Sequence, residues 1–229
     1  MEGLFRTPRF RISGDTGLLV EYGDCIAPEV NRKVRAVTVL LDKERLPGIL
    51  EVVPTYRSVL ILYDPAVLEI STLFILVEDL ERRLDESVIP PPKTVIIPVC
   101  YGDEFGPDIE FVAQYSGINV SEVIRVHSGV AYQIYMIGFA PGFPFLGGLP
   151  EILHTPRLET PRDRVLPGSV GIANNQTGIY PVESPGGWRL IGRTPLRLFD
   201  PNSENPFLYE SGDLIKFEPI SREEYRDLI

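Results

Sequence analysis

In Ile137-Gly-Phe-Ala-Pro-Gly-Phe-Pro-Phe-Leu-Gly-Gly-Leu149, 13 residues hold four glycines, two prolines, three phenylalanines and no charged side chain. Exposed loops are usually polar, and core strands rarely hold this much glycine and proline, because proline removes a hydrogen bond of the sheet. The glycines and prolines of the segment therefore determine its backbone conformation. Two interpretations stay open: it lines a pocket or contacts a partner, or it is a buried connection between two strands.

The sequence on both sides of this segment alternates short apolar runs with turns. The 229-residue chain contains 22 prolines and 20 glycines, which is below the level of a disordered protein and typical of a turn-rich β protein. From residue 94 onward this spacing predicts a closed or sandwich-like β domain. Two short helices precede the segment, with Asp108 and Ser121 as their predicted N-caps. The predicted strands are residues 94–99, 130–137, 170–173, 178–181, 188–191, 196–199 and 214–217.

The first part of the chain follows the order ββαββα. Residues 28–41 and 70–84 have apolar side chains at helical spacing, and the apolar runs around them predict strands. This order predicts a small sheet with two helices on one side, an α+β fold. Three consecutive prolines, Pro90, Pro91 and Pro92, form a stiff extended run that cannot join a sheet. We therefore expect an N-terminal domain of residues 1–88 and a C-terminal domain of residues 89–229.

Charge and composition exclude several classes of protein. The net charge of −10 disfavours binding to nucleic acid or to an anionic membrane. No apolar run approaches the roughly 20 residues of a membrane span, and no secretory signal opens the chain. We therefore expect a cytoplasmic protein. Cys25 and Cys100 lie far apart and outside any metal-binding pattern, and the chain has only two histidines, so we predict no metal site and no disulfide.

Arginine is concentrated between residues 155 and 198. This stretch contains six arginines, no lysine and three acidic residues. The planar guanidinium group suits carboxylates and phosphates better than the flexible ammonium group of lysine does. An anion-binding or partner-docking face is one interpretation, and ordinary surface ion pairs are the other. The six residues are Arg157, Arg162, Arg164, Arg189, Arg193 and Arg197.

Four other side chains are candidates for a functional site. His127 lies at the end of a predicted helix, where it could cap that end or belong to a site. Gln176 and Tyr180 flank a glycine turn, where neutral hydrogen-bonding groups could orient an amide or lactam. Trp188 is a core or pocket-wall aromatic. Residues 187–194 differ from a phosphate-binding P-loop by bulky side chains and by a predicted strand where that loop needs a helix, so we expect no ATP site in this chain.

Longer motifs resemble those of one family, allophanate hydrolase subunit 1. In the C-terminal half they are residues 138–148, 160–162, 167–171, 176–181 and 183–201, and shorter matches occur at residues 14–15, 46–48, 52–54 and 56–58. The resemblance covers nearly the whole chain. It implies a small N-terminal α/β domain followed by a cyclophilin-like β-barrel, in agreement with the boundary expected at the three prolines.

The resemblance also implies a function. The family includes the B subunit of prokaryotic 5-oxoprolinase, which implies that this chain is one subunit of a lactam hydrolase that opens 5-oxoproline to L-glutamate. The implied partners are a subunit 2 protein (the C subunit) and an A subunit that carries the ATP-dependent step, so that this chain itself binds no cofactor. Two alternatives remain. One is inhibition of a sensor histidine kinase, as by the family's sporulation-kinase inhibitor, and the other is carboxyl transfer as in urea carboxylase, which needs a biotin carrier.

Site residues follow from this implied chemistry. A lactam activated as its phosphate carries both a carboxylate and a phosphate, and both groups are ligands for arginine. Neutral polar side chains would position the ring or transfer a proton. The predicted substrate-binding residues are Arg162, Arg164 and Arg193, the predicted catalytic residues are His127, Gln176 and Tyr180, and the predicted pocket wall or partner contact consists of Phe139, Pro141, Phe143 and Trp188.

Overall fold

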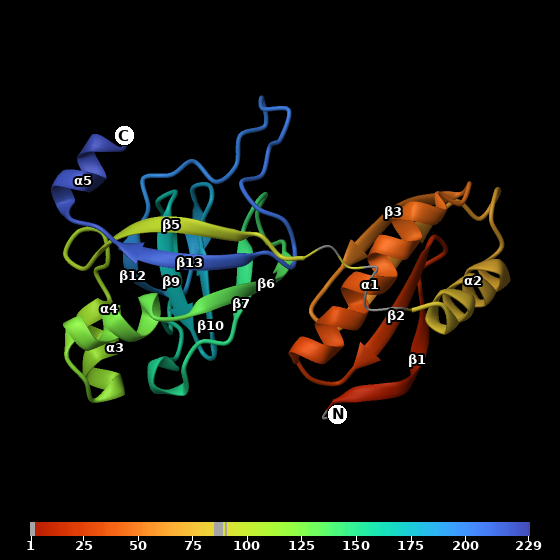
Figure 1. Cartoon of the computed structure of the whole chain (residues 1–229), viewed down its shortest axis with the longest axis horizontal. Coiled ribbons are helices and arrows are strands. Elements are labelled where there is room, and N and C mark those ends of the chain that lie inside the picture. Colours follow the sequence, from red (N-terminus) through yellow and green to blue (C-terminus); the bar gives the residue numbers. More distant parts are fainter. Residues whose placement is uncertain (1–2, 85–88, 90) are drawn as a thin grey trace. The chain divides into compact units, whose positions relative to one another are not determined.

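The structure is a computed structural model that describes residues 3–84, 89 and 91–229. Its contacts divide the chain into two compact units, Met1–Pro91 and Pro92–Ile229 (Figure 1). The domain boundary expected between residues 88 and 89 involves residues 85–88 and Pro90, which lie outside the described residues, so that boundary stays a prediction. In the described part of the chain, no helix is long and apolar enough to cross a membrane.

The first unit is an antiparallel sheet with two helices packed on one face. Its elements are β1 (Leu4–Ser13), β2 (Gly17–Gly23), α1 (Pro28–Glu44), β3 (Ile49–Pro54), β4 (Ser58–Tyr63) and α2 (Ile70–Arg82). The strand order is β1-β2-β4-β3. Pro28 begins α1 with the backbone angle that a helix needs. Leu18 of β2 and Ile61 of β4 are fully buried in one core with apolar residues of both helices. The predicted mixed α+β arrangement is therefore confirmed.

The second unit is built on a closed barrel. Its strands are β5 (Thr94–Tyr101), β6 (Ala131–Ile137), β7 (Pro144–Gly147), β9 (Ser169–Ala173), β10 (Gln176–Ile179), β12 (Arg189–Arg193) and β13 (Leu214–Pro219). Their order is β10-β7-β6-β13-β5-β12-β9, and neighbours are antiparallel except β13 and β5, which run parallel. Closure removes the unpaired edges of the sheet. The closed β domain predicted from the turn spacing is present, and it is consistent with a cyclophilin-like fold.

Short helices and a two-stranded ribbon surround the barrel. They are α3 (Ile109–Ser116), α4 (Val120–Ser128), η2 (Glu151–Leu153) and α5 (Arg222–Asp227), with the ribbon strands β8 (Arg162–Val165) and β11 (Ser184–Gly186). The N-cap of α4 is Asn119, whose side chain accepts a hydrogen bond from the Glu122 backbone N–H (2.8 Å). The predicted cap Ser121 is therefore wrong. Ser121 lies in the first turn of the helix, and its hydroxyl donates to Asn119 (2.5 Å).

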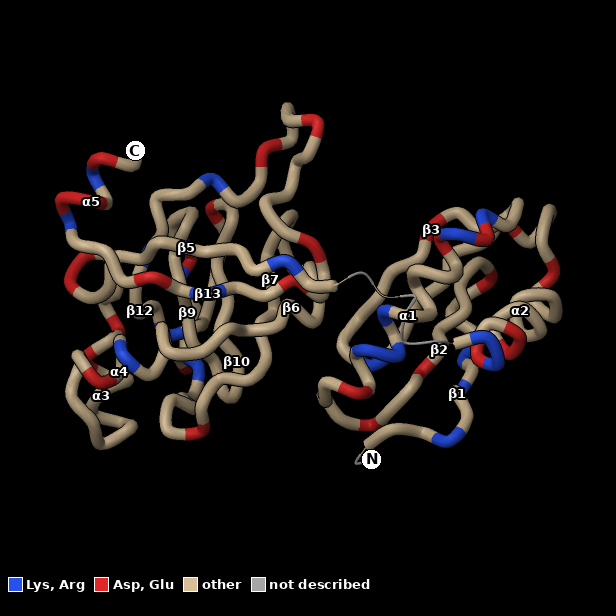
Figure 2. Tube along the Cα trace, viewed as in Figure 1, with Lys and Arg blue, Asp and Glu red and all other residues tan. Residues whose placement is uncertain are grey.

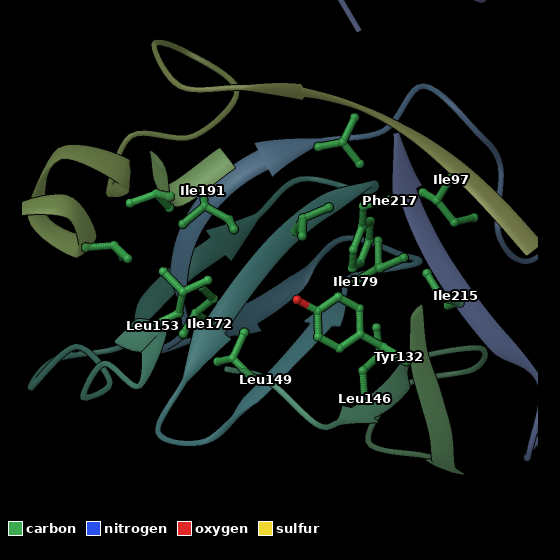
Figure 3. Close-up of a cluster of buried hydrophobic side chains, with 14 of the residues drawn as sticks. Ile97, Tyr132, Leu146, Leu149, Leu153, Ile172, Ile179, Ile191, Ile215 and Phe217 are labelled. Carbon is green, nitrogen blue, oxygen red and sulfur yellow. The ribbon is translucent and has the colours of Figure 1, made fainter. Parts of the chain in front are cut away.

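The barrel interior is filled by apolar side chains from opposite strands (Figure 3). Ile172, Ile215 and Phe217 are almost completely buried there. Tyr132 is fully buried as well, and its hydroxyl donates to the backbone carbonyl of His127 (2.8 Å). Because these side chains fill the interior, a ligand site must lie outside the barrel core.

Two parts of the predicted strand pattern are wrong. Segment 137–149 contains a strand of its own, β7, which pairs with β6 and β10. Residues 196–199 form no strand, and only Phe199 makes an isolated bridge, to Phe207. They belong to the long loop that precedes β13 (Figure 1). The Leu196 N–H donates to the side chain of Thr194 (3.2 Å) instead of to a neighbouring strand, which leads the chain away from the sheet.

Candidate functional site

The main candidate site is a cavity of about 400 Å³ in the barrel unit, which is within the size range of small-molecule pockets. Its walls come from the loop between β6 and β7 with the strand β7 itself, the loop between η2 and β8, and the stretch between β10 and β12. We term this cavity the aromatic pocket. Its lining residues are Phe139, Phe143, Phe145, Arg157, Leu158, Pro161, Tyr180, Pro185, Gly186, Gly187 and Trp188.

Edge-to-face contacts between rings build the inner wall of the aromatic pocket. The buried Phe143 ring has its centroid 5.1 Å from that of Tyr180 and 5.4 Å from that of Trp188, with interplanar angles of 82° and 86°. Phe139 meets Phe143 in the same way at 5.5 Å, but its side chain is 65% exposed. Such pairs are favourable because the positive edge of one ring meets the negative face of the other. The pocket therefore has a packed inner wall and one aromatic side chain at its mouth.

The glycine-rich segment places Phe139 at the mouth by an unusual backbone path. Phe139 has a φ of +67°, a left-handed conformation that residues other than glycine rarely adopt. The Gly138 N–H donates to the Phe143 carbonyl (3.1 Å), which closes the loop around Phe139. The Tyr209 hydroxyl donates to the Gly142 carbonyl (2.8 Å) and fixes the loop to the rest of the unit. Strained residues of this kind cluster at functional sites, so the geometry favours the pocket interpretation of segment 137–149.

Tyr180 lies deep in the aromatic pocket, where it is almost completely buried. Burial raises the pKa of its hydroxyl, and the Trp188 backbone N–H that donates to this hydroxyl opposes the shift. Gly186 leaves room for the group, because a Cβ atom there would lie 2.4 Å from the hydroxyl oxygen. The hydroxyl lines the pocket, so its hydrogen can be donated to a ligand. Among the residues that the structure describes, none accepts that hydrogen.

Arg157 is the charged residue of the pocket lining. Its side chain is exposed and forms no hydrogen bond or ion pair with any other described residue. The Leu158 N–H donates to the Gly187 carbonyl (2.8 Å), which ties this loop to the opposite wall of the pocket. A guanidinium group without an internal partner is available to an anionic group of a ligand.

The other arginines of residues 155–198 already have partners. Residues of both charge signs are interspersed along the barrel unit (Figure 2), an arrangement that favours ion pairs. Five of the six arginines between residues 155 and 198 bind another described residue, and three of these contacts are ion pairs. Arg157 is the exception. Arg162 pairs with Asp108 (2.8 Å), Arg164 with Glu183 (2.7 Å) and Arg197 with Asp200 (3.1 Å), while Arg193 donates to the Tyr225 hydroxyl (2.9 Å) and Arg189 to the Pro156 carbonyl (3.3 Å).

Asp108 holds Arg162 outside the aromatic pocket. One carboxylate oxygen of Asp108 accepts from Arg162 (2.8 Å), and the other accepts from the Leu190 N–H (2.7 Å). Asp108 is the N-cap residue of α3, as predicted, but its side chain makes no capping hydrogen bond. The nearly buried carboxylate joins α3, β8 and β12 instead.

His127 lies in the barrel core and does not line the aromatic pocket. The Thr177 hydroxyl donates to the Gly171 carbonyl (3.0 Å), so its oxygen accepts from the His127 Nε2–H (2.9 Å). His127 Nδ1 then accepts from the Tyr101 hydroxyl (2.8 Å). Burial lowers the pKa of His127 to about 3, so the imidazole is neutral and does not complement the helix dipole by charge. The side chain joins α4, β5 and β10.

The structure brings some of the predicted site residues together and separates the others. Gln176 begins β10, at the opposite end of that strand from Tyr180, and Pro141 lies outside the pocket lining. Arg157 was not singled out from the sequence, because the partner of each arginine comes from a distant part of the chain. Only the fold shows which of these arginines has no partner in the part of the chain that the structure describes. The predicted residues that line the aromatic pocket are Phe139, Phe143, Tyr180 and Trp188.

The aromatic pocket combines apolar walls, one hydroxyl donor and a guanidinium group that has no partner among the described residues. This combination suits a small flat molecule that carries a hydrogen-bond acceptor and a negative charge. A group of three or more histidine, cysteine, aspartate or glutamate side chains that could hold a metal ion does not occur in residues 3–84, 89 and 91–229.

Comparison with known proteins gives the family of the chain. Residues 8–209 match the model of the carboxyltransferase domain, subdomain C and D, and the chain belongs to this family. It is 42% identical to the B subunit of 5-oxoprolinase from Bacillus subtilis (strain 168), with 96% of each chain covered. The B subunit of 5-oxoprolinase from Escherichia coli O157:H7 is 39% identical over 92% of this chain and 95% of that protein. The resemblance inferred from the motifs is confirmed.

A solved structure has the same fold. TTHA0988 matches 90% of this chain with a TM-score of 0.81 and 36% sequence identity. This chain spans 40% of the TTHA0988 chain. The matching region is therefore one part of a longer polypeptide in TTHA0988.

Proposed function

We propose that this chain is the B-type subunit of a 5-oxoprolinase, which opens the lactam ring of 5-oxoproline to L-glutamate with ATP. The observation that carries the proposal is the aromatic pocket, because it offers a small ring apolar walls, a hydroxyl donor and a guanidinium group without a partner among the described residues. The names of the two relatives that share 42% and 39% identity over nearly their whole length support the same conclusion. The chain would act as a hydrolase subunit together with partners.

The chemistry of this reaction suits a pocket that holds the ring in place. A lactam is a weak electrophile, so transfer of a phosphoryl group from ATP to its oxygen activates the ring carbon. Water adds to this carbon, and the ring C–N bond breaks as the nitrogen takes up a proton. A second water hydrolyses the resulting acyl phosphate to glutamate and phosphate. Holding the ring in one orientation accelerates the steps up to ring opening, and the Tyr180 hydroxyl supplies a donor for this purpose.

We propose that the partners are a C subunit and an A subunit, and that the A subunit uses the ATP. In TTHA0988 the region that matches this chain belongs to a longer polypeptide, which supports a function shared between this chain and further domains. Inhibition of a sensor histidine kinase stays a prediction. It is tested separately by the effect of this chain on kinase autophosphorylation.

Reconstitution of the purified subunits tests the proposed function. The three proteins are mixed with 5-oxoproline and ATP, and the formation of glutamate and ADP is measured. We expect glutamate formation to require this chain. Glutamate formation at an unchanged rate after this chain is omitted would contradict the proposal.

A further inference from the structure

We infer that Arg157 makes the aromatic pocket selective for ligands with a carboxylate, and that this chain binds 5-oxoproline without its partners. The identity of the ring rests on the proposed function. The selection by charge rests on the residues of the pocket itself.

The first step is the availability of the Arg157 guanidinium group. It lines the aromatic pocket and is unpaired among the described side chains. Arg162, by comparison, would have to leave the Asp108 carboxylate, and an aspartate that is nearly buried would then lose its cation. Binding of an anion at Arg157 disrupts no existing ion pair.

The second step is the shape of the walls. Tyr180 and Trp188 each meet Phe143 at nearly a right angle, so the inner wall presents both ring faces and ring edges. Phe139 adds an exposed ring at the mouth. The methylene groups of a lactam ring can pack on such surfaces, whereas the carboxylate must stay near the exposed Arg157.

The third step is the free hydrogen of the Tyr180 hydroxyl. A donor that lines the pocket and has no acceptor among the described residues favours a ligand with a carbonyl oxygen at this position. The two contacts give 5-oxoproline one orientation, with its lactam oxygen at Tyr180 and its carboxylate at Arg157. A ring without the carboxylate keeps only the first contact.

Tryptophan fluorescence measures this binding directly, because Trp188 lines the pocket and is the single tryptophan of the chain. The full chain is titrated with 5-oxoproline and with 2-pyrrolidone, the same lactam without a carboxylate. We expect a saturable response to both, with 5-oxoproline bound about 10- to 100-fold more tightly, as a charge-assisted hydrogen bond allows.

Two variants separate the two contacts. Arg157→Ala is expected to reduce the affinity for 5-oxoproline to that for 2-pyrrolidone, whereas Arg197→Ala, at an exposed arginine outside the pocket lining, keeps the wild-type preference. Tyr180→Phe is expected to weaken both ligands by a similar factor and to preserve their ratio. Circular dichroism and the thermal midpoint establish that each variant is folded.

The outcomes distinguish this inference from the proposed function. Three outcomes overturn the inference, whether or not the reconstituted complex forms glutamate. They are a wild-type preference for 5-oxoproline in Arg157→Ala, equal affinity of the wild-type chain for both ligands, and no saturable response to 5-oxoproline. If Arg157 selects the charged ligand but the reconstituted complex forms no glutamate, the inference is upheld and only the proposed function is overturned.

Discussion

At the scale of single residues, His127 makes the stability of the barrel core depend on pH. Its two ring nitrogens are satisfied in the neutral form, because Nε2–H donates to Thr177 and Nδ1 accepts from the Tyr101 hydroxyl. Protonation of Nδ1 would leave the Tyr101 hydroxyl hydrogen without this acceptor. Burial adds the loss of hydration that a charged imidazole would suffer. The His127 imidazole is therefore protonated less readily in the folded chain than in the unfolded chain.

Stability is expected to decrease as the pH falls below 6.5. The pKa of His127 is lowered from 6.5 to about 3, so between these values the unfolded state binds a proton that the folded state does not. This difference removes about 2 kcal/mol of unfolding free energy between pH 6.5 and pH 5. Urea unfolding of the full chain at pH 7 and pH 5 measures the effect.

A pair of variants isolates the contribution of His127. His127→Gln removes the titrating group, so we expect its stability to change less between pH 7 and pH 5 than that of the wild type. His154→Gln, at the other histidine of the chain, is expected to keep the wild-type decrease. An equal decrease in both variants would show that His127 is not the source.

The predicted wall residues lie nearer to the aromatic pocket than the predicted arginines do. Phe139, Pro141 and Phe143 are predicted as wall residues from the unusual apolar, glycine-rich run, and Trp188 is predicted separately as a core or pocket-wall aromatic. The pocket lining contains Phe139, Phe143 and Trp188 but not Pro141. The predicted arginines were separated from the pocket by partners that are distant in sequence, such as Asp108 for Arg162. Pairing over such distances leaves no local signal in the sequence.

At the scale of elements, β11, which pairs with β8 in a two-stranded ribbon, forms one side of the aromatic pocket. Gly186 of β11 pairs with Arg162 of β8, and Gly187 follows directly. The two glycines have different surroundings. A Cβ atom at Gly186 would lie 2.4 Å from the Tyr180 hydroxyl oxygen, whereas one at Gly187 would have Pro161 as its nearest neighbour, at 3.6 Å. Gly186 is therefore needed for close packing against Tyr180, whereas Gly187 has room for a side chain.

Gly186→Ala is expected to destabilise the chain by about 1–3 kcal/mol, because the new methyl group must displace the ring of Tyr180. It is also expected to weaken 5-oxoproline binding in the fluorescence titration. Gly187→Ala is the matched control, with little change in either measurement. Equal effects of the two substitutions in urea unfolding would contradict the assigned role of Gly186.

The elements that sequence patterns missed are short and lack apolar alternation. β8 reads Arg-Asp-Arg-Val, with Asp163 and Arg164 exposed, and β7 begins with a proline. The strand β9, by contrast, is a buried apolar run, and its predicted residues 170–173 fall within its observed bounds. Patterns of burial predict strands in the sheet interior, whereas strands at the pocket are held by specific contacts that a pattern does not contain.

At the scale of the whole molecule, the two units have separate cores. All residues of the first core lie between Leu4 and Leu84. The two clusters of the second unit lie between Val95 and Phe217, and the lining of the aromatic pocket belongs entirely to that unit. Each core buries its own apolar surface, which is the condition for independent folding.

A fragment of residues 92–229 is expected to fold alone and to bind 5-oxoproline with the affinity of the full chain. The reason is that both its core and the pocket lining are complete within these residues. Circular dichroism and Trp188 fluorescence measure folding and binding. An unfolded fragment would show that residues 1–91 are needed for folding. A folded fragment that has lost the affinity would show that they contribute to the site.

The parallel pairing of β5 with β13 has a consequence for synthesis of the chain. The Lys93 N–H donates to Asp213, 120 residues later, and β5 and β13 lie side by side beyond that point (Figure 1). On the ribosome the first unit is complete early, whereas the barrel cannot close until β13 has emerged. During that interval β5 is open to incorrect pairing. Pro98 in the middle of β5 has no N–H group, so the waiting strand offers one donor fewer to a foreign strand.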